Sequence, residues 1–289
     1  MSAPAEPPPP TASEPRLIAF DLDGTLLRGD KSLSARSLRA LYAAHERGAL
    51  IVPATGRIYK GVPAPLREAP FARYFITING ALVYDARADA ALCRAELPND
   101  LALRLMEHMD ALDVIYDCYK DNWGYVSRAM YERAGDYISD RGILALFYRS
   151  RTPVEDLKEF LRADGGSVQK AQMHFRDMRA KKRELELLPA LFPEVAVSTS
   201  VPSNIELNIA AANKGEALLS LCAALGVAPE ETLAFGDGTN DLTMLRAAGC
   251  GAAMGNADFA VKAAADTVCD DNEHDGLAKF LERLLAEDP

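Results

Sequence analysis

The chain has 289 residues, of which 49% are hydrophobic and 26% charged, a composition typical of a soluble globular protein with room for two domains. Its 32 Lys and Arg against 42 Asp and Glu give a formal net charge of −10, which argues against general nucleic-acid binding because that function needs a basic surface. No apolar run approaches the roughly 18 residues of a membrane span. Five scattered cysteines favour free thiols in a reducing cytoplasm over disulfides or a zinc site.

The N-terminal segment, residues 1–15, is rich in proline. It lacks both the basic start and the apolar centre of a signal peptide. Because stacked prolines cannot donate ladder hydrogen bonds, we predict a disordered lead-in over these residues.

Three short apolar runs are separated by helical patterns. Residues 17–21, 49–57 and 232–241 each predict a buried strand that delivers polar or small residues at its carboxyl end. Residues 34–48 and 214–226 predict helices that stop at Gly48 and Gly226. This alternation predicts an α/β fold with a Rossmann-like, largely parallel sheet covered on both faces. Ligands of such sheets bind beyond the carboxyl ends of the strands.

The spacing of these elements predicts a second, inserted domain. Lys214 follows Thr55 by 159 positions, far more than one crossover connection needs. We therefore predict a core domain over residues 16–84 and 204–289, and an inserted α+β cap over 85–203. Within the insertion we expect helices near 99–112, 152–163 and 179–191, and strands at 113–120, 122–127, 167–175, 194–200 and 204–210. These elements favour an antiparallel sheet with helices on one face.

Acidic residues follow two of the core strands. Asp21 and Asp23 are two apart on extended chain, so their carboxylates point to the same side, while Leu22 turns toward the core. Asp237 and Asp241 follow another strand and are expected at the same rim. Four carboxylates without cysteine or histidine partners form a hard-oxygen site suited to Mg²⁺. A single such stretch is also compatible with an acidic turn at Gly24, but two of them in one chain favour a site.

Taken in order, several short motifs resemble those of the haloacid dehalogenase (HAD) phosphohydrolase superfamily. They are DLDGTLL at 21–27, TGR at 55–57, NGA at 79–81, Lys214 at a helix start, and FGDGTNDLTML at 235–245. The large insertion between the second and third motifs resembles the Cof-type (IIB) subgroup, whose α/β cap lies there. The resemblance extends from residue 16 to about residue 285.

The resemblance implies a role for each matching residue. Asp21 is expected to attack phosphorus and form an aspartyl-phosphate, and Asp23 to act as acid and then as base. Mg²⁺ is expected to bind the carboxylates of Asp21 and Asp237 and the backbone carbonyl of Asp23. The phosphoryl group is expected to contact Leu22, Thr55, Gly56, Lys214 and Asn240, with Asp241, Arg57 and Asn79 in supporting roles.

Some of these residues have a plainer interpretation as well. By itself Lys214 is typical of a solvated lysine at a helix start, and only its place in the motif series favours a site. Arg57 contacts substrate or pairs with a nearby acid, and Asn79 is a turn residue or a site residue. In the insertion, Tyr116, Tyr119, Trp123 and Tyr125 are more typical of packing between sheet and helix than of substrate stacking.

The leading hypothesis is a Mg²⁺-dependent phosphatase of small-molecule phosphate monoesters such as sugar phosphates, with a cap that sets specificity. Two alternatives stay open. One is a sugar phosphomutase, which resembles this layout and shares the aspartyl-phosphate step. The other is a catalytically silent phosphate-binding module of the same fold. We expect no nucleic-acid or membrane partner, a cytoplasmic location, and a monomer or homodimer.

Overall fold

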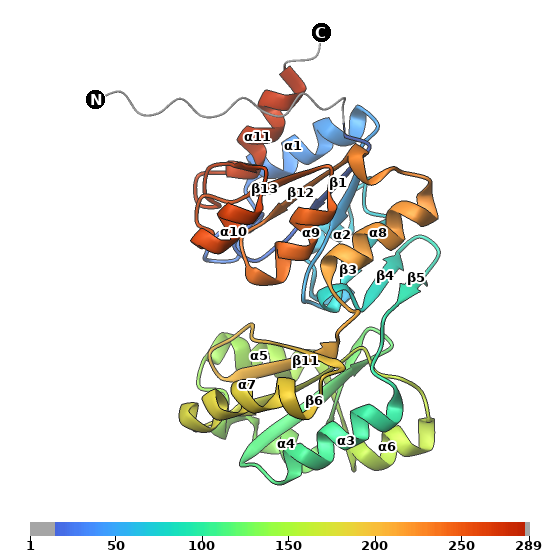
Figure 1. Ribbon diagram of the computed structural model, residues 1–289, viewed down its shortest axis with the longest axis vertical. Helices are drawn as coiled ribbons and strands as arrows, with labels where there is room; N and C mark the ends of the chain where they lie inside the picture. The colour runs from blue at the N-terminus through green and yellow to red at the C-terminus, as the bar shows by residue number, and fades with distance from the viewer. Residues whose placement is uncertain (1–14, 287–289) are drawn as a thin grey trace, which may run out of the picture. The chain divides into compact units, whose positions relative to one another are not determined.

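The computed structural model describes residues 15–286, which divide into two compact units (Figure 1). Among the described residues, the first unit comprises 15–57, Val62–Cys93 and 213–286. The second comprises Ile58–Gly61 and Arg94–Ala212. The predicted disordered lead-in lies outside the described residues except for Pro15, which is buried.

The first unit is built on a five-stranded parallel sheet in the order β14-β13-β12-β1-β2. Its strands are β1 (Leu17–Phe20), β2 (Leu50–Pro53), β12 (Thr232–Gly236), β13 (Cys250–Ala253) and β14 (Thr267–Val268). The three interior strands, β1, β12 and β13, are buried along their whole length, as expected for a parallel sheet with both faces covered. The predicted α/β fold is confirmed.

Helices cover both faces of this sheet. On one face α1 (Ala35–Glu46) and α11 (Gly276–Ala286) pack side by side, and the ring of Phe280 meets that of Phe235 edge to face (Figure 1). On the other face α8 (Lys214–Leu225), α9 (Leu242–Ala247) and α10 (Phe259–Ala264) share a core with alternate residues of β1 such as Leu17 and Ala19. Asn213 caps the start of α8 by accepting from the Glu216 N–H, so the position of Lys214 is fixed locally.

Short elements complete the first unit. A three-stranded sheet contains β3 (Tyr74–Thr77), β4 (Leu82–Asp85) and β5 (Ala90–Arg94), in that order. Single turns of helix lie at α2 (Ala64–Arg67), η2 (Ile78–Gly80), η4 (Pro229–Glu231) and η5 (Thr239–Asp241). The turn η5 directly follows β12 and carries the acidic residue Asp241.

The second unit contains a six-stranded sheet in the order β10-β11-β9-β6-β7-β8. All neighbours are antiparallel except β7 and β8, which are parallel. Its strands are β6 (Val114–Lys120), β7 (Trp123–Ser127), β8 (Arg151–Val154), β9 (Lys170–Phe175), β10 (Val195–Ser198) and β11 (Asn204–Ile209). Its helical elements are η1 (Tyr59–Gly61), α3 (Asn99–Asp110), α4 (Arg128–Glu132), η3 (Ala134–Asp136), α5 (Arg141–Ser150), α6 (Leu157–Asp164) and α7 (Met178–Leu191).

The prediction of helices on one face only is wrong. The main core of the second unit joins α3, α6 and α7 to one face of the sheet. A separate apolar cluster joins the other face to the segment that holds η3 and α5, through Ile115, Val126, Ala134 and Phe147. The sheet of this unit therefore has helices on both faces.

A second correction concerns the helix predicted over 152–163. Residues 151–154 form the edge strand β8, and the helix starts only at Leu157, after Asp156 caps it by accepting from the Glu159 N–H. Pro153 lacks an N–H, which an edge strand tolerates because one of its sides needs no ladder partner.

The boundaries of the inserted unit differ from the predicted ones. The predicted insertion runs from 85 to 203, whereas the compact unit runs from Arg94 to Ala212, nine residues later at each end. The reason at the first end is the β4–β5 hairpin, which extends a sheet of the first unit. At the second end β11 pairs with β9 and β10 and so belongs to the inserted sheet.

Two general features of the chain follow from the structure. Within residues 15–286, no helix combines the length and the apolar character that crossing a bilayer requires. All five cysteines are free thiols, four of them buried.

Candidate active site

Asp21 is the first residue after β1, and its N–H donates to the carbonyl of Phe235 in β12. Its carboxylate lies 2.5 Å from the ammonium group of Lys214, which also donates to Asp241 Oδ1 at 2.6 Å. Lys214 has no exposed surface, and Asp21 and Asp241 are buried as well. A buried cation held by two carboxylates from separate elements is not the solvated lysine of the plainer interpretation.

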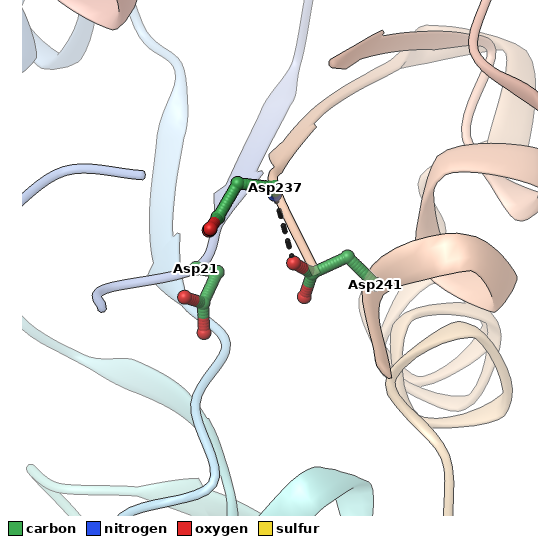
Figure 2. A group of neighbouring side chains, drawn as sticks. All are labelled: Asp21, Asp237 and Asp241. Carbon is green, nitrogen blue, oxygen red and sulfur yellow. Dashed lines mark hydrogen bonds between the residues drawn. The ribbon is translucent and has the colours of Figure 1, made fainter. Parts of the chain in front are cut away.

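The loop after β12 supplies the other carboxylates. Asp241 Oδ2 accepts from the N–H groups of Asp237 and Gly238, which closes the loop on itself. Asp237 Oδ1 accepts from the hydroxyl of Thr25 at 2.7 Å. Figure 2 shows the carboxyl groups of Asp21 and Asp237, at the ends of β1 and β12, close to that of Asp241 on η5. One ligand oxygen of each lies within 4.8 Å of the others.

Crowding of these acids changes their pKa values. Burial, partly offset by Lys214, raises the pKa of Asp21 to about 7, and the neighbouring Asp241 adds to the rise. Burial also raises the pKa of Asp237 to about 6, against the hydrogen bond from Thr25. The pKa of Lys214 is raised because the charges of Asp21 and Asp241 outweigh the effect of burial. The site therefore carries more carboxylate charge than its one buried lysine can neutralise.

The excess of carboxylate charge makes this site suitable for a metal ion. Asp21, Asp237 and Asp241 offer only oxygen ligands, at a spacing that one ion can span. Hard oxygen donors with excess negative charge suit Mg²⁺. The residues present fit the ion that the sequence predicts.

Asp23 has a different environment from Asp21. Arg57 donates to both of its oxygens, from Nε at 2.8 Å and from a terminal nitrogen at 2.6 Å, and the ammonium group of Lys31 lies 2.9 Å from Oδ1. Although burial alone would raise it, these two cations, Arg57 first, hold the pKa of Asp23 below its ordinary value. Of the two interpretations of Arg57, the structure places it in a pair with an acid.

The predicted phosphate contacts lie around the same strand ends. Thr55 is buried after β2, and its hydroxyl oxygen accepts from the Arg57 N–H at 3.2 Å. Asn79 has a left-handed backbone, with φ at 59°, and its side-chain oxygen would lie 2.7 Å from a Cβ at Gly56. Asn240 is exposed on η5. Leu22 is fully buried, so its side chain offers no surface to a ligand.

Three residues at the site were not among those predicted. Thr25 and Lys31 contact Asp237 and Asp23 as described above. The side-chain amide of Asn256 donates to the carbonyl of Gly24 at 2.9 Å and lies 3.5 Å from Asp237 Oδ2. The signal for Thr25 was its place directly after Gly24 in DLDGTLL, but Lys31 and Asn256 reach the site only through folded loops, which local patterns do not specify.

The aromatic residues of the second unit have local partners. The Tyr125 ring stacks on that of Phe160 with centroids 4.9 Å apart, and the Tyr116 hydroxyl donates to Asp110 at 2.7 Å. The Trp123 indole N–H donates to Thr152. The cation groups of Arg151 and Lys170 both lie over the Tyr119 ring. These contacts agree with the interpretation that the four rings pack within the unit.

The comparisons with known proteins agree on one family. The model of the haloacid dehalogenase-like hydrolases matches residues 18–281. The 5-amino-6-(5-phospho-D-ribitylamino)uracil phosphatase YitU of Bacillus subtilis is 29% identical over 95% of this chain and 99% of the relative. The pyridoxal phosphate phosphatase YbhA of Escherichia coli is 30% identical over 92% of this chain and 97% of the relative. A haloacid dehalogenase-like hydrolase from Bacteroides thetaiotaomicron, 28% identical, superimposes with a TM-score of 0.79 over 93% of this chain and 99% of its own.

The chain belongs to the haloacid dehalogenase-like hydrolase family. The predicted resemblance to the Cof-type phosphohydrolases of this superfamily is confirmed. The prediction that the chain is a phosphatase, an enzyme that hydrolyses phosphoric monoesters, is also confirmed at the level of enzyme class.

Proposed function

We propose that this enzyme is a Mg²⁺-dependent phosphatase of small-molecule phosphate monoesters that works through an aspartyl-phosphate on Asp21. The observation that supports the proposal is the buried group of Asp21, Lys214 and Asp241 beside Asp237, at the carboxyl ends of two neighbouring parallel strands. Such an arrangement costs folding energy, because it concentrates like charges away from water. A binding site for a cation and an anionic phosphoryl group accounts for that cost.

In the first step an oxygen of the Asp21 carboxylate forms a bond to phosphorus, and the bond from phosphorus to the leaving oxygen breaks. Lys214 donates to Asp21 Oδ1, which would leave Oδ2 to attack phosphorus. The electron pair of the broken bond stays on the leaving oxygen, which takes a proton from Asp23. To act as this acid, Asp23 has to give up part of its pairing with Arg57 and take a proton as substrate binds.

In the second step Asp23, now ionised, takes a proton from a water molecule. The water oxygen attacks phosphorus, and the bond between phosphorus and Asp21 breaks to release inorganic phosphate and restore the carboxylate. Thr55 and the backbone N–H groups of Leu22 and Gly56 would bind phosphoryl oxygens, and Asn240 would donate to them from the rim. The ionised form of Asp23 is favoured by Arg57 and Lys31, which suits its role as the base.

The carboxylates of Asp21 and Asp237, with the backbone carbonyl of Asp23, would hold Mg²⁺. When bound, the ion supplies positive charge that lets a carboxylate approach an anionic phosphoryl group. Asp241 fixes Lys214 and the Asp237 loop through its two oxygens. Asn79 supports the turn beside Gly56.

The substrate class is proposed from the relatives. The names of YitU and YbhA describe phosphatases of a ribitylaminouracil phosphate and of pyridoxal phosphate, which are both small metabolites. We therefore place the substrate among small phosphate monoesters. The cytoplasmic location, the absence of nucleic-acid or membrane partners, and a monomeric or homodimeric state remain predictions from the sequence.

The experiment compares the wild-type protein with Asp21→Asn on p-nitrophenyl phosphate in the presence of Mg²⁺. Asparagine preserves the shape of the side chain but removes the nucleophile, so we expect turnover to fall by at least about 1,000-fold. Asp100→Asn, an exposed substitution in α3, serves as the control and should retain wild-type turnover. Circular dichroism checks that the variants are folded.

Two further measurements separate the alternatives. Hydroxylamine trapping should capture an acyl phosphate in the wild-type protein and none in Asp21→Asn. Release of inorganic phosphate without a bisphosphate activator distinguishes a phosphatase from a mutase. Wild-type turnover by Asp21→Asn would refute the proposal, as would activity that survives complete chelation of divalent metal.

A further inference from the structure

Lys31 lies in a loop that is held firmly in place. The N–H of Gly29 donates to Glu273 at 2.7 Å, Arg28 pairs with Asp275, and the Asn272 amide donates to the carbonyl of Leu27. The turn closes with a bond from the Lys31 N–H to the carbonyl of Arg28 at 2.8 Å. The loop therefore presents Lys31 at a defined position.

The backbone of Lys31 is in the left-handed region, with φ at 67°. This conformation is unfavourable for a residue with a Cβ, and glycine or asparagine is the usual choice there. From this position the side chain, 59% exposed, directs its ammonium group to within 2.9 Å of Asp23 Oδ1. An ion pair this exposed contributes little to stability, so folding does not explain a lysine in this place.

Asp23 already has a full counter-charge from Arg57. The guanidinium group of Arg57 bonds to both carboxylate oxygens, and its side chain is only 27% exposed. Lys31 therefore adds one unit of positive charge beyond what Asp23 needs.

We propose that Lys31, together with Arg57, forms an anion subsite beside Asp23 that binds a second negatively charged group on the leaving part of the substrate. The inference rests on the proposed function, because it takes Asp23 as the group that protonates the leaving oxygen. A ligand group next to that oxygen lies within reach of the two cations that surround Asp23. The subsite selects phosphate monoesters in which a carboxylate or a second phosphoryl group lies a few bonds from the ester oxygen.

Arg57 and Lys31 contribute differently to this subsite. Arg57 is half-buried and forms a planar fork, which suits a carboxylate or phosphoryl group in one orientation. Lys31 is exposed, and its ammonium group is a point charge on a long stem, which suits anions of different size.

The test uses three substrates that differ in one group: ethyl phosphate, 2-phosphoglycolate and ethane-1,2-diol bisphosphate. The measured quantity is kcat/KM for each charged ester divided by that for ethyl phosphate. Lys31→Gly removes the ammonium group and fits the left-handed backbone, so it should fold at least as well as the wild-type protein. We expect the ratio to fall about tenfold for at least one charged ester in this variant.

Two other variants sharpen the result. Lys31→Arg keeps the charge and should retain most of the ratio. Lys279→Gln removes a surface lysine that pairs with Asp270 in the same unit, and should leave the ratio at the wild-type value. The two charged esters decide whether the subsite favours a carboxylate or a phosphoryl group.

A binding measurement tests the subsite independently of the proposed catalytic function. Calorimetry gives the Kd of 2-phosphoglycolate and of ethyl phosphate for the inert Asp21→Asn protein and for the double variant Asp21→Asn/Lys31→Gly. The preference for 2-phosphoglycolate, measured as the ratio of the two Kd values, should be lost in the double variant. If the wild-type protein hydrolyses none of the esters but the binding ratio changes, the proposed chemistry fails and the subsite stands. If both ratios are the same in wild-type and Lys31→Gly backgrounds, the subsite is refuted and the phosphatase is unaffected.

Discussion

At the scale of single residues, the closest steric constraint on the site falls on Gly24. Its φ is 92°, and a Cβ at this position would collide with the carboxylate of Asp237, lying 2.7 Å from Cγ. The same carboxylate is held on its other side by the Thr25 hydroxyl. The glycine between Asp23 and Thr25 thus lets the β12 loop approach the end of β1.

Gly24→Ala should therefore damage activity more than stability. The left-handed backbone alone costs an alanine about 1 kcal/mol of folding stability. Displacement of Asp237 by about 1 Å should lower kcat/KM on p-nitrophenyl phosphate by roughly 100-fold. Steady-state kinetics and urea unfolding measure the two effects.

Gly48→Ala is the matched control for this substitution. Its φ is 96°, and a Cβ placed there would meet no atom of the described residues within 4 Å, so it carries the same backbone cost without the collision. We expect a similar loss of stability and wild-type kinetics. Equal activity of the two variants would mean that the position of Asp237 is not critical.

The residues of the site differ in how far the sequence could reveal them. Asp21, Asp23 and Asp237 follow strands with clear local signals, so their meeting at one sheet edge was predictable. Asp241 was expected in a supporting role, and in the structure it accepts a hydrogen bond from Lys214. The contacts of Lys31 and Asn256 depend on how two loops fold over this edge, which no periodic pattern encodes.

At the scale of elements, β9 in the second unit carries an unusual row of buried polar residues. Lys170, Gln172 and His174 alternate along one side of the strand, and all are buried. Lys170 pairs with Glu206 of β11, and Gln172 donates to Asp117 of β6. The sheet register places Asp117 and Glu206 on either side of Gln172, so Glu206 reaches Lys170 diagonally.

This row shows which elements the sequence could predict. The strands β6, β9 and β11 were predicted near their observed bounds, because each is a run of suitable residues between turn signals. The helix α5 was not predicted, although Asp140 caps it by accepting from the Ile143 N–H. The apolar residues of α5 pack on the sheet face that carries Lys170, Gln172 and His174. A sequence pattern alone does not predict an apolar helix next to buried charged residues.

His174 gives a test of this buried face. Burial lowers its pKa from 6.5 to about 4, and its Nδ1 lies 3.2 Å from the Ser203 hydroxyl while Nε2 has no partner within residues 15–286. Between pH 6.5 and 4 the unfolded chain binds a proton that the folded protein does not. Neutral His174 therefore makes its full contribution to the free energy of unfolding above about pH 6.5, and this contribution is lost as the pH falls toward 4.

We expect the second unit to lose about 2 kcal/mol of stability from His174 alone between pH 7 and pH 5. His174→Gln removes this titration, so the variant should show a smaller loss over the same interval. The single tryptophan of the chain, Trp123, lies in β7 and reports urea unfolding of this unit by fluorescence. His274→Gln, an exposed change in the first unit, controls for histidine removal in general. Equal pH dependence in the wild-type and His174→Gln proteins would contradict the assignment.

At the scale of the whole molecule, the chain has separate apolar cores in its two units. The core of the first unit joins β1, β12 and α8, and the main core of the second joins β6, β9 and α3. The Asp21, Asp237 and Asp241 cluster lies wholly in the first unit. A ligand that binds only the folded first unit stabilises that unit by mass action.

Mg²⁺ should therefore protect the two units unequally. At 100 times its Kd, the ion should stabilise the first unit by about 2.7 kcal/mol, which slows exchange through global opening of that unit by about 100-fold. Hydrogen exchange read by mass spectrometry should show this slowing in peptides from β1, β12 and α8. Peptides from β6 and β9 should change little, because their core contains no metal ligand of the cluster.

The control for this experiment is Asp237→Asn, which removes one carboxylate and should abolish the protection at the same Mg²⁺ concentration. Equal slowing in both units would mean that the chain opens as one cooperative body, since a ligand in one part then stabilises every part by the same free energy. No slowing anywhere would argue against metal binding at Asp21 and Asp237. Slowing confined to β6 and β9 would place the ion in the second unit, away from the carboxylates at the ends of β1 and β12.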